Sequence, residues 1–113
     1  MLEFMELVPF TRRLRALAKE HSDDVLMEIQ SDLLANAKPG KVVEGTAGVR
    51  KARVASPARG KGKSDGFRYL YFYIEQDGQI CLLMIFSKEE QADLRGEQKK
   101  NLARAVQELK ETP

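Results

Sequence analysis

The chain has 113 residues, of which 42% are hydrophobic and 32% are charged, and its formal net charge is +2. These values predict one globular domain, 1–113, and exclude an intrinsically disordered chain. A single cysteine excludes an internal disulfide and a CxxC metal knuckle. The first ten residues contain acids but no cations, which argues against a signal peptide, so we expect a soluble, cytoplasmic protein with no membrane partner.

The first third of the sequence predicts a strand followed by two helices. The apolar-rich run Leu2–Val8 is stopped by a proline, which is typical of an edge strand. Thr11 can cap a first helix that continues to about Lys19. Ser22 is followed by two acids, which favours a second helix start, and this helix ends before Pro39. We expect the two helices to pack against each other in antiparallel directions.

The central part predicts three strands. Lys41–Gly48 is interpreted as a connection, and Val49–Ala55 then alternates with the period of a strand. Phe67–Glu75 and Ile80–Phe86 are dense in β-forming residues, and the Asp-Gly pair between them is typical of a hairpin. Because both runs are apolar on both parities, we expect two central strands that are covered on each side.

The last part predicts helical structure. Ser87–Glu90 has the pattern of a capping box that opens a helical turn. A final helix over residues 97–110 carries an apolar stripe formed by Leu102, Val106 and Leu109. The predicted class is therefore α+β, with a small antiparallel sheet flanked by helices and the order β-α-α-β-β-β-α.

Positive charge is concentrated in one segment, Val49–Arg68. Seven cations against one acid, Asp65, give this segment a net charge of +6, so the remaining residues together carry −4. Glycines lie among the cations of the basic loop 56–66, which therefore cannot hold a helix or pack a core. Such a local excess of positive charge points to a polyanionic partner. The cations are Arg50, Lys51, Arg53, Arg59, Lys61, Lys63 and Arg68.

Several chemistries can be set aside. Gly62-Lys63-Ser64 looks like the tail of a phosphate-binding P-loop, but the motif needs a glycine where Pro57 stands, and a strand follows instead of a helix. With one histidine and one cysteine, the chain lacks the ligands for a catalytic metal, so we expect no metal and no small-molecule cofactor. His21 is interpreted as a surface residue and Cys81 as a core thiol.

One reaction suits lysine and arginine alone. RNA carries its own nucleophile, the 2′-hydroxyl, so cleavage requires alignment of that group with the phosphate and stabilisation of the developing charge. By parity, Lys51 and Arg53 share one face of their strand, whereas Arg50, Ala52 and Val54 share the other. DNA lacks the hydroxyl, and the same residues would bind it without cutting it.

Three segments carry a resemblance to a known family. GTAGVRKARVAS, GKGKSDGFRYLYFY and CLLMIFSKEEQADL, in this order and spacing, resemble the RelE/HigB-like toxins of bacterial type II toxin–antitoxin modules, and the HigB subgroup in particular. The likeness covers about residues 25–110. It implies a RelE/ParE-like sheet flanked by helices, metal-free cleavage of mRNA in the ribosomal A site, and silencing by a cognate helix-turn-helix antitoxin.

The resemblance also implies roles for individual residues. The cations that it places on the RNA are Lys51, Arg53 and Arg59. The cations that it places in the catalytic group are Lys61, Lys63, Arg68 and Lys88, with Arg68 matching the arginine that stabilises the cleaved phosphate. Which cation acts as general base, and which codons are preferred, stay open.

The sequence departs from the subgroup pattern at two positions. Phe86 stands where a tyrosine is usual, and Asp65 replaces a glycine. These departures leave open a non-catalytic RNA- or ribosome-binding module of the same fold, and a gyrase-directed toxin of the wider superfamily is a third reading. The tyrosines at 69, 71 and 73 are interpreted as a packed face in preference to a base-stacking platform.

Overall fold

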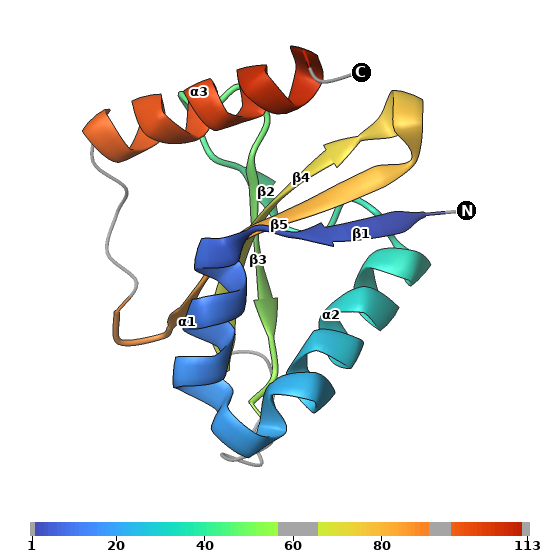
Figure 1. The fold of residues 1–113 in the computed structure, drawn as a ribbon, viewed down its shortest axis with the longest axis vertical. Coiled ribbons are helices and arrows are strands. Elements are labelled where there is room, and N and C mark those ends of the chain that lie inside the picture. Colours follow the sequence, from blue (N-terminus) through green and yellow to red (C-terminus); the bar gives the residue numbers. More distant parts are fainter. Residues whose placement is uncertain (1, 57–65, 91–95, 112–113) are drawn as a thin grey trace.

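The computed structural model describes residues 2–56, 66–90 and 96–111 (Figure 1). A strand, two helices, four further strands and a last helix follow one another, with 3₁₀ turns at Lys19–His21 and Glu75–Asp77. The elements are β1 (Glu3–Glu6), α1 (Val8–Ala18), α2 (Ser22–Ala35), β2 (Lys41–Val42), β3 (Arg50–Val54), β4 (Phe67–Ile74), β5 (Gln79–Ser87) and α3 (Gly96–Glu111).

The five strands form one mixed sheet in the order β1-β5-β4-β3-β2. The predicted α+β class and the order of the main elements are confirmed, and β4 and β5 are central as expected. Two details differ from the prediction. β1 lies parallel to β5, with Phe4 beside Ile80, and the expected connection after Pro39 contains the short strand β2. Sequence periodicity indicates the face of each residue but not the direction of its neighbouring strand.

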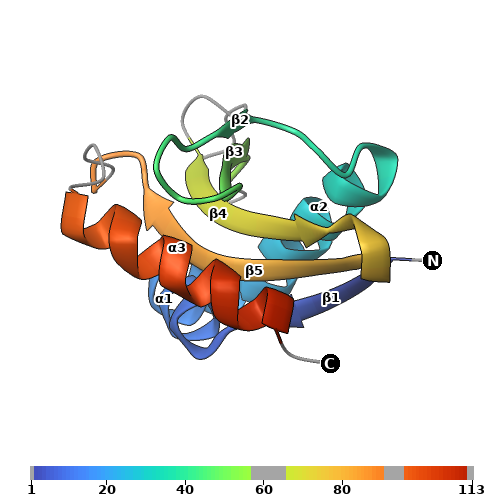
Figure 2. The same cartoon turned by 90° about the horizontal axis from the view of Figure 1, so that it is seen from above.

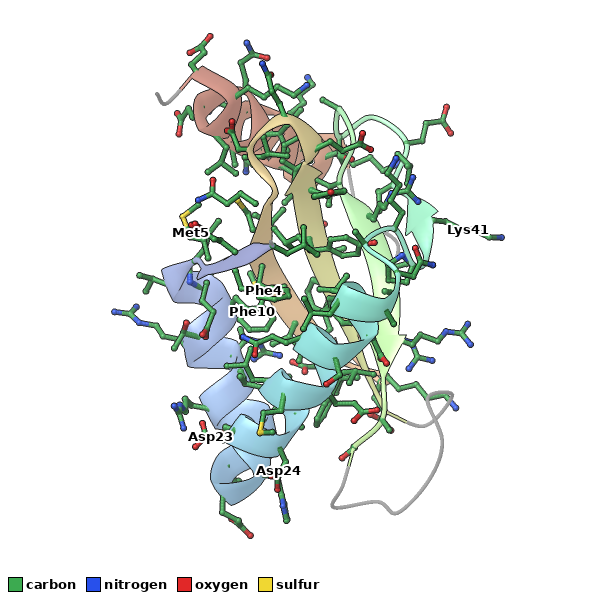
Figure 3. The ribbon with its side chains drawn as sticks, turned by 90° about the vertical axis from the view of Figure 1, so that its right-hand side faces the viewer. Phe4, Met5, Phe10, Asp23, Asp24 and Lys41 are labelled. Atoms are coloured by element: carbon green, nitrogen blue, oxygen red, sulfur yellow. The ribbon has the colours of Figure 1, made fainter. Side chains whose placement is uncertain are left out.

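The sheet is covered on both faces. Figure 2 looks from the side of α3 and shows this helix in front of the sheet, with α1 and α2 behind it. One core lies between the sheet and α1 and α2, and a second lies between the sheet and α3. On β1, Phe4 points to the first core together with Phe10, whereas Met5 points to the second (Figure 3). None of the described helices has the length and apolar composition of a membrane span.

The two predicted N-caps are wrong in detail although both helices exist. α1 begins at Val8, with Pro9 in its first turn, because the fixed backbone angle of proline suits a helix start. Thr11 therefore lies inside the helix and donates a hydrogen bond to Oε1 of Glu6 at 3.0 Å. Ser22 opens α2 but does not cap it, since its buried hydroxyl donates to the carbonyl of Lys19 at 2.6 Å.

The expected capping box after β5 is confirmed. The backbone N–H of Ser87 donates to Oε1 of Glu90 at 3.1 Å, and the N–H of Glu90 donates to the Ser87 hydroxyl at 3.1 Å. The same carboxylate forms an ion pair with Arg13 on α1, and this hydrogen bond from Arg13, with those from Ser87, lowers the pKa of Glu90. The turn at the end of β5 is thereby tied to α1. The stripe of α3 packs onto the sheet as predicted.

The loop over residues 36–40 is held against β3. The hydroxyl of Tyr71 donates to the carbonyl of Pro39 at 2.6 Å, and Nη1 of Arg50 donates to the carbonyl of Gly40 at 3.3 Å. Gly40 adopts a φ of +79°, and a Cβ at this position would lie 2.0 Å from the carbonyl oxygen of Lys51. Only glycine permits this approach, so the loop and β3 have a fixed relative position.

We predict that Gly40→Ala lowers the free energy of unfolding by about 1–3 kcal/mol, because alanine is strained at this φ and its methyl group meets the backbone of β3. Gly96→Ala is the matched control, since a Cβ there meets nothing within 4 Å. Urea denaturation of both variants measures the difference. Equal stabilities for the two variants would contradict the described loop.

We also predict a pH effect that depends on Tyr71. Burial raises the pKa of Tyr71 to about 12, partly offset by the Arg50 guanidinium, whereas the unfolded chain has the ordinary value near 10. The folded state therefore holds the Tyr71 proton more tightly than the unfolded chain does. The protonated Tyr71 hydroxyl contributes fully to stability below pH 10, and this contribution is lost as the pH rises towards 12.

In Tyr71→Phe, the free energy of unfolding should fall less steeply between pH 10 and 12 than in the wild type. At neutral pH, the lost hydrogen bond should lower the free energy of unfolding by about 0.5–1.5 kcal/mol. Denaturant unfolding at a series of pH values measures both effects, with Tyr73→Phe on the same strand as control. Identical pH profiles for the wild type and Tyr71→Phe would exclude this role.

Candidate nucleic-acid interface

The strand register brings cations from three strands to one place. Arg53 on β3 lies directly opposite Arg68 on β4, and Lys51 on β3 lies opposite Lys41 on β2. Residues directly opposite in an antiparallel pair share a face of the sheet. Gly66, the residue just before β4, packs directly against the backbone of β3. A Cβ on Gly66 would lie 1.9 Å from the carbonyl oxygen of Val54.

These cations line a cleft with a volume of about 450 Å³. The cleft lies beside β3, beyond the two residues of that strand that β2 covers, and the loop over residues 36–40 and α2 supply its other wall. In Figure 3 this edge of the sheet lies on the right, where the Lys41 side chain points outward from β2. The lining residues are Asp32, Pro39, Gly40, Lys41, Lys51, Ala52, Arg53, Arg68 and Tyr69.

Positive charge dominates the cleft. Lys41 and Arg53 are exposed and Lys51 is half-buried, and none of the three forms an ion pair with a carboxylate of the described residues. Arg68 is only 6% exposed, and its Nη1 donates to the carbonyl of Gly66 at 3.2 Å. A concave surface with several cations of one sign concentrates anions such as phosphate.

Asp32 and Tyr69 add polar groups to this cleft. Tyr69 is fully buried, and its hydroxyl has no hydrogen-bond partner among the described residues. Burial raises the pKa of Tyr69 far above its ordinary value, and the hydroxyl of Tyr71 and the carboxylate of Asp32 raise it further. The Tyr69 hydroxyl therefore stays protonated at neutral pH and can both donate and accept a hydrogen bond.

The structure brings together three of the predicted site residues: Lys51, Arg53 and Arg68 line the one cleft. Lys88 lies in the exposed turn after β5 and is not part of the lining. Phe86, the departure from the family pattern, lies directly opposite Arg68. The remaining predicted residues, Arg59, Lys61 and Lys63, lie outside the described residues, as does Asp65.

Other expectations can be compared with the structure. Tyr69 and Tyr71 are fully buried, as the packed-face interpretation predicted, and they offer no platform for stacking bases. Cys81 is a buried core residue, and burial raises the pKa of its thiol. His21 is partly exposed at the junction of α1 and α2, close to Glu20 and Asp24.

Sequence reasoning missed Lys41, Asp32 and Tyr69 as parts of the cleft. A signal for Lys41 was present, because Lys41-Val42-Val43 follows a Pro-Gly turn and its two valines favour a strand. No comparable signal places Asp32 beside Tyr69, since that contact depends on how α2 packs on the sheet. Among the described residues, no three histidine, cysteine or acidic side chains form a group that could hold a metal ion.

Comparison with known proteins relates this geometry to a fold. No protein-family model matches the chain. The structure resembles a chain of the intact E. coli RelBE toxin–antitoxin complex, with a TM-score of 0.57 and 14% identity over 80% of this chain and 100% of that one. It also resembles the isolated E. coli RelE toxin, with a TM-score of 0.57 and 12% identity over 96% and 99% of the two chains. The chain therefore has the RelE-like fold.

Proposed function

We propose that this chain is the toxin of a bacterial type II toxin–antitoxin module, of the HigB subgroup, and that it cuts mRNA in the ribosomal A site. The RelE-like fold supports this proposal, since one structural neighbour is a toxin and the other is a toxin–antitoxin complex. The observation that carries it is the cleft, where Lys41, Lys51, Arg53 and Arg68 from three strands meet. Cations grouped in this way fit a sugar–phosphate backbone.

The proposed reaction needs no metal. Lys51 and Arg53 hold phosphates on either side of the scissile bond, which aligns the RNA. An uncharged lysine takes the proton of the 2′-hydroxyl as the 2′-oxygen bonds to the adjacent phosphorus, the P–O5′ bond breaks, and the 5′-oxygen takes a proton from water, giving a 2′,3′-cyclic phosphate and a 5′-hydroxyl. Arg68 stabilises the charge that develops on the phosphate oxygens. Its burial suits this role, because a charge–charge interaction is stronger away from water.

The partners follow from the same proposal. The ribosome and its mRNA are the target, which places the protein in the cytoplasm, and a cognate helix-turn-helix antitoxin neutralises it. The RelBE complex among the structural neighbours supports an antitoxin partner. A small neighbouring gene whose product binds this chain and restores growth would test the assignment of the module.

One observation favours a second candidate, a non-catalytic RNA- or ribosome-binding module. Phe86 pairs with Arg68 across β4 and β5, so the position beside the proposed catalytic arginine carries no hydroxyl. If the family tyrosine contributes to cleavage, its loss would leave RNA binding without cutting. Mapping of mRNA ends after induction separates the two functions, since only the nuclease creates new ends.

We predict that Arg68→Gln slows mRNA cleavage by about 10²–10³-fold, the usual loss when one charge-stabilising group is removed from a transition state. Arg12→Gln is the matched control, because Arg12 is exposed on α1 and does not line the cleft. Growth arrest on expression and primer extension on a reporter mRNA give the activity, and thermal melting shows that each variant is folded. A folded Arg68→Gln variant that cuts as fast as Arg12→Gln would refute the site.

A further inference from the structure

The first two helices carry opposite charges on their exposed sides. α1 and α2 lie next to each other on one face of the sheet, and the turn Lys19–His21 joins them so that they run in roughly opposite directions (Figure 1). α1 contains arginines and no acid, whereas α2 contains acids and no cation. We call their exposed surface the helix-pair face. Its exposed cations are Arg12, Arg15 and Lys19, and its exposed acids are Asp23, Asp24 and Glu28.

Most of these charges are not neutralised across the two helices. Among the described residues, a single ion pair joins the cationic row to the acidic row, between Arg15 and Asp23 at 3.6 Å. Arg12, Lys19 and Glu28 form no ion pair with any residue in the described part of the chain. Their charges can therefore pair with charges on another molecule.

The same two helices expose large apolar side chains. Met27 and Leu34 on α2 are 65% and 60% exposed, and Val8 on α1 is 61% exposed. Four large hydrophobic residues are exposed in the described part of the chain, and these helices carry three of them. Exposed apolar side chains bordered by charge are typical of protein–protein contacts, where apolar burial supplies affinity and charge determines orientation.

The order of the charges makes the helix-pair face complementary to itself. A twofold axis that lies in the contact plane and runs along the helices places α1 of one copy on α2 of the other, twice over. The cationic row of each copy then meets the acidic row of its partner. A twofold axis across the helices would instead place α1 on α1 and α2 on α2, which brings like charges together.

We propose that the helix-pair face is a symmetric contact between two copies of this chain, with α1 of each copy lying antiparallel on α2 of the other. Arg12 and Glu28 lie at equal distances along the chain from the turn between the helices, so Arg12 comes to lie beside Glu28 of the partner subunit. The lining of the cleft contains none of the charged residues of this face. The inference therefore goes beyond the proposed function and does not depend on it.

Sedimentation velocity of the full chain over a concentration series measures this contact without any variant. The wild type should pass from monomer to dimer as its concentration rises. Raising the salt concentration from about 0.05 M to about 0.5 M should raise the dissociation constant of the dimer about tenfold, because salt screens exposed ion pairs.

Two charge-reversal variants test the pairing of the rows. The acidic variant, Arg12→Glu/Arg15→Glu, has two acidic rows, and the basic variant, Asp24→Lys/Glu28→Lys, has two basic rows. Each variant alone should stay monomeric at concentrations where the wild type is a dimer, since like charges meet on both sides of the axis. An equal mixture of the two should form a heterodimer, because every acidic row then meets a basic one.

A matched control separates this effect from net charge. Lys100→Glu/Arg104→Glu makes the same change in charge as the acidic variant, at exposed positions of α3 outside the helix-pair face. It should form dimers with the wild-type dissociation constant. Thermal melting shows that each variant is folded, and if a reversal variant does not fold, the wild-type concentration and salt series decides the question.

The contrary results are equally distinct. A wild type that stays monomeric at every concentration and at low salt would overturn the proposal, and the helix-pair face would then be left to a partner of different sequence, such as an antitoxin. A folded reversal variant that forms dimers as tightly as the wild type would overturn it as well. So would two folded variants that form no heterodimer when mixed.

Discussion

The pairing of β3 with β4 determines where the cations of the cleft lie. It places Arg53 directly opposite Arg68, an arrangement of like charges that costs up to about 1 kcal/mol in a sheet. On the opposite face of the same two strands, Val54 lies opposite Phe67 and both side chains are buried. Burial of each such side chain contributes about 1.5–3 kcal/mol to the stability of the fold. The free energy gained by burying these apolar side chains therefore exceeds the cost of placing Arg53 opposite Arg68, and the two cations stay side by side.

The second wall of the cleft depends on a different set of contacts. The loop over residues 36–40 leaves α2 and is held by Tyr71 and Arg50, which belong to the sheet and not to the loop. The same loop leads into β2 and so places Lys41 opposite Lys51. The sheet therefore supplies the cations and also fixes the position of the loop over residues 36–40, which lines the cleft beside them. This loop follows α2, whose Asp32 lines the same cleft.

The sequence was sufficient to predict the parts of this structure that follow from local pattern. β4 and β5 have apolar residues on both parities, and the apolar stripe of α3 has helical spacing, so burial alone predicted their type and place. Local pattern also predicts that Lys51 and Arg53 share one face, since alternation along a strand is a local property. The charge of the basic segment likewise follows from composition.

What could not be predicted depends on pairing and packing between distant segments. β2 has only two residues, too few to show a periodic pattern, so the sequence predicts only a connection at Lys41. The parallel direction of β1 is set by the neighbouring β5, 76 residues later in the Glu3–Gln79 pair. The approach of Asp32 to Tyr69 likewise requires α2 to pack on the sheet at one angle. Side-chain patterns predict which residues are buried but not which residues meet.

A reconstituted translation system can show whether the grouped cations make an RNA strand cleave itself through its own 2′-hydroxyl. An mRNA whose A-site codon contains ordinary ribonucleotides is compared with one that carries 2′-deoxynucleotides in that codon alone. The first mRNA should be cut, with a 2′,3′-cyclic phosphate at the new end, and the second should stay whole. Cleavage within the deoxy codon, or an ordinary mRNA that remains intact, would contradict this mechanism.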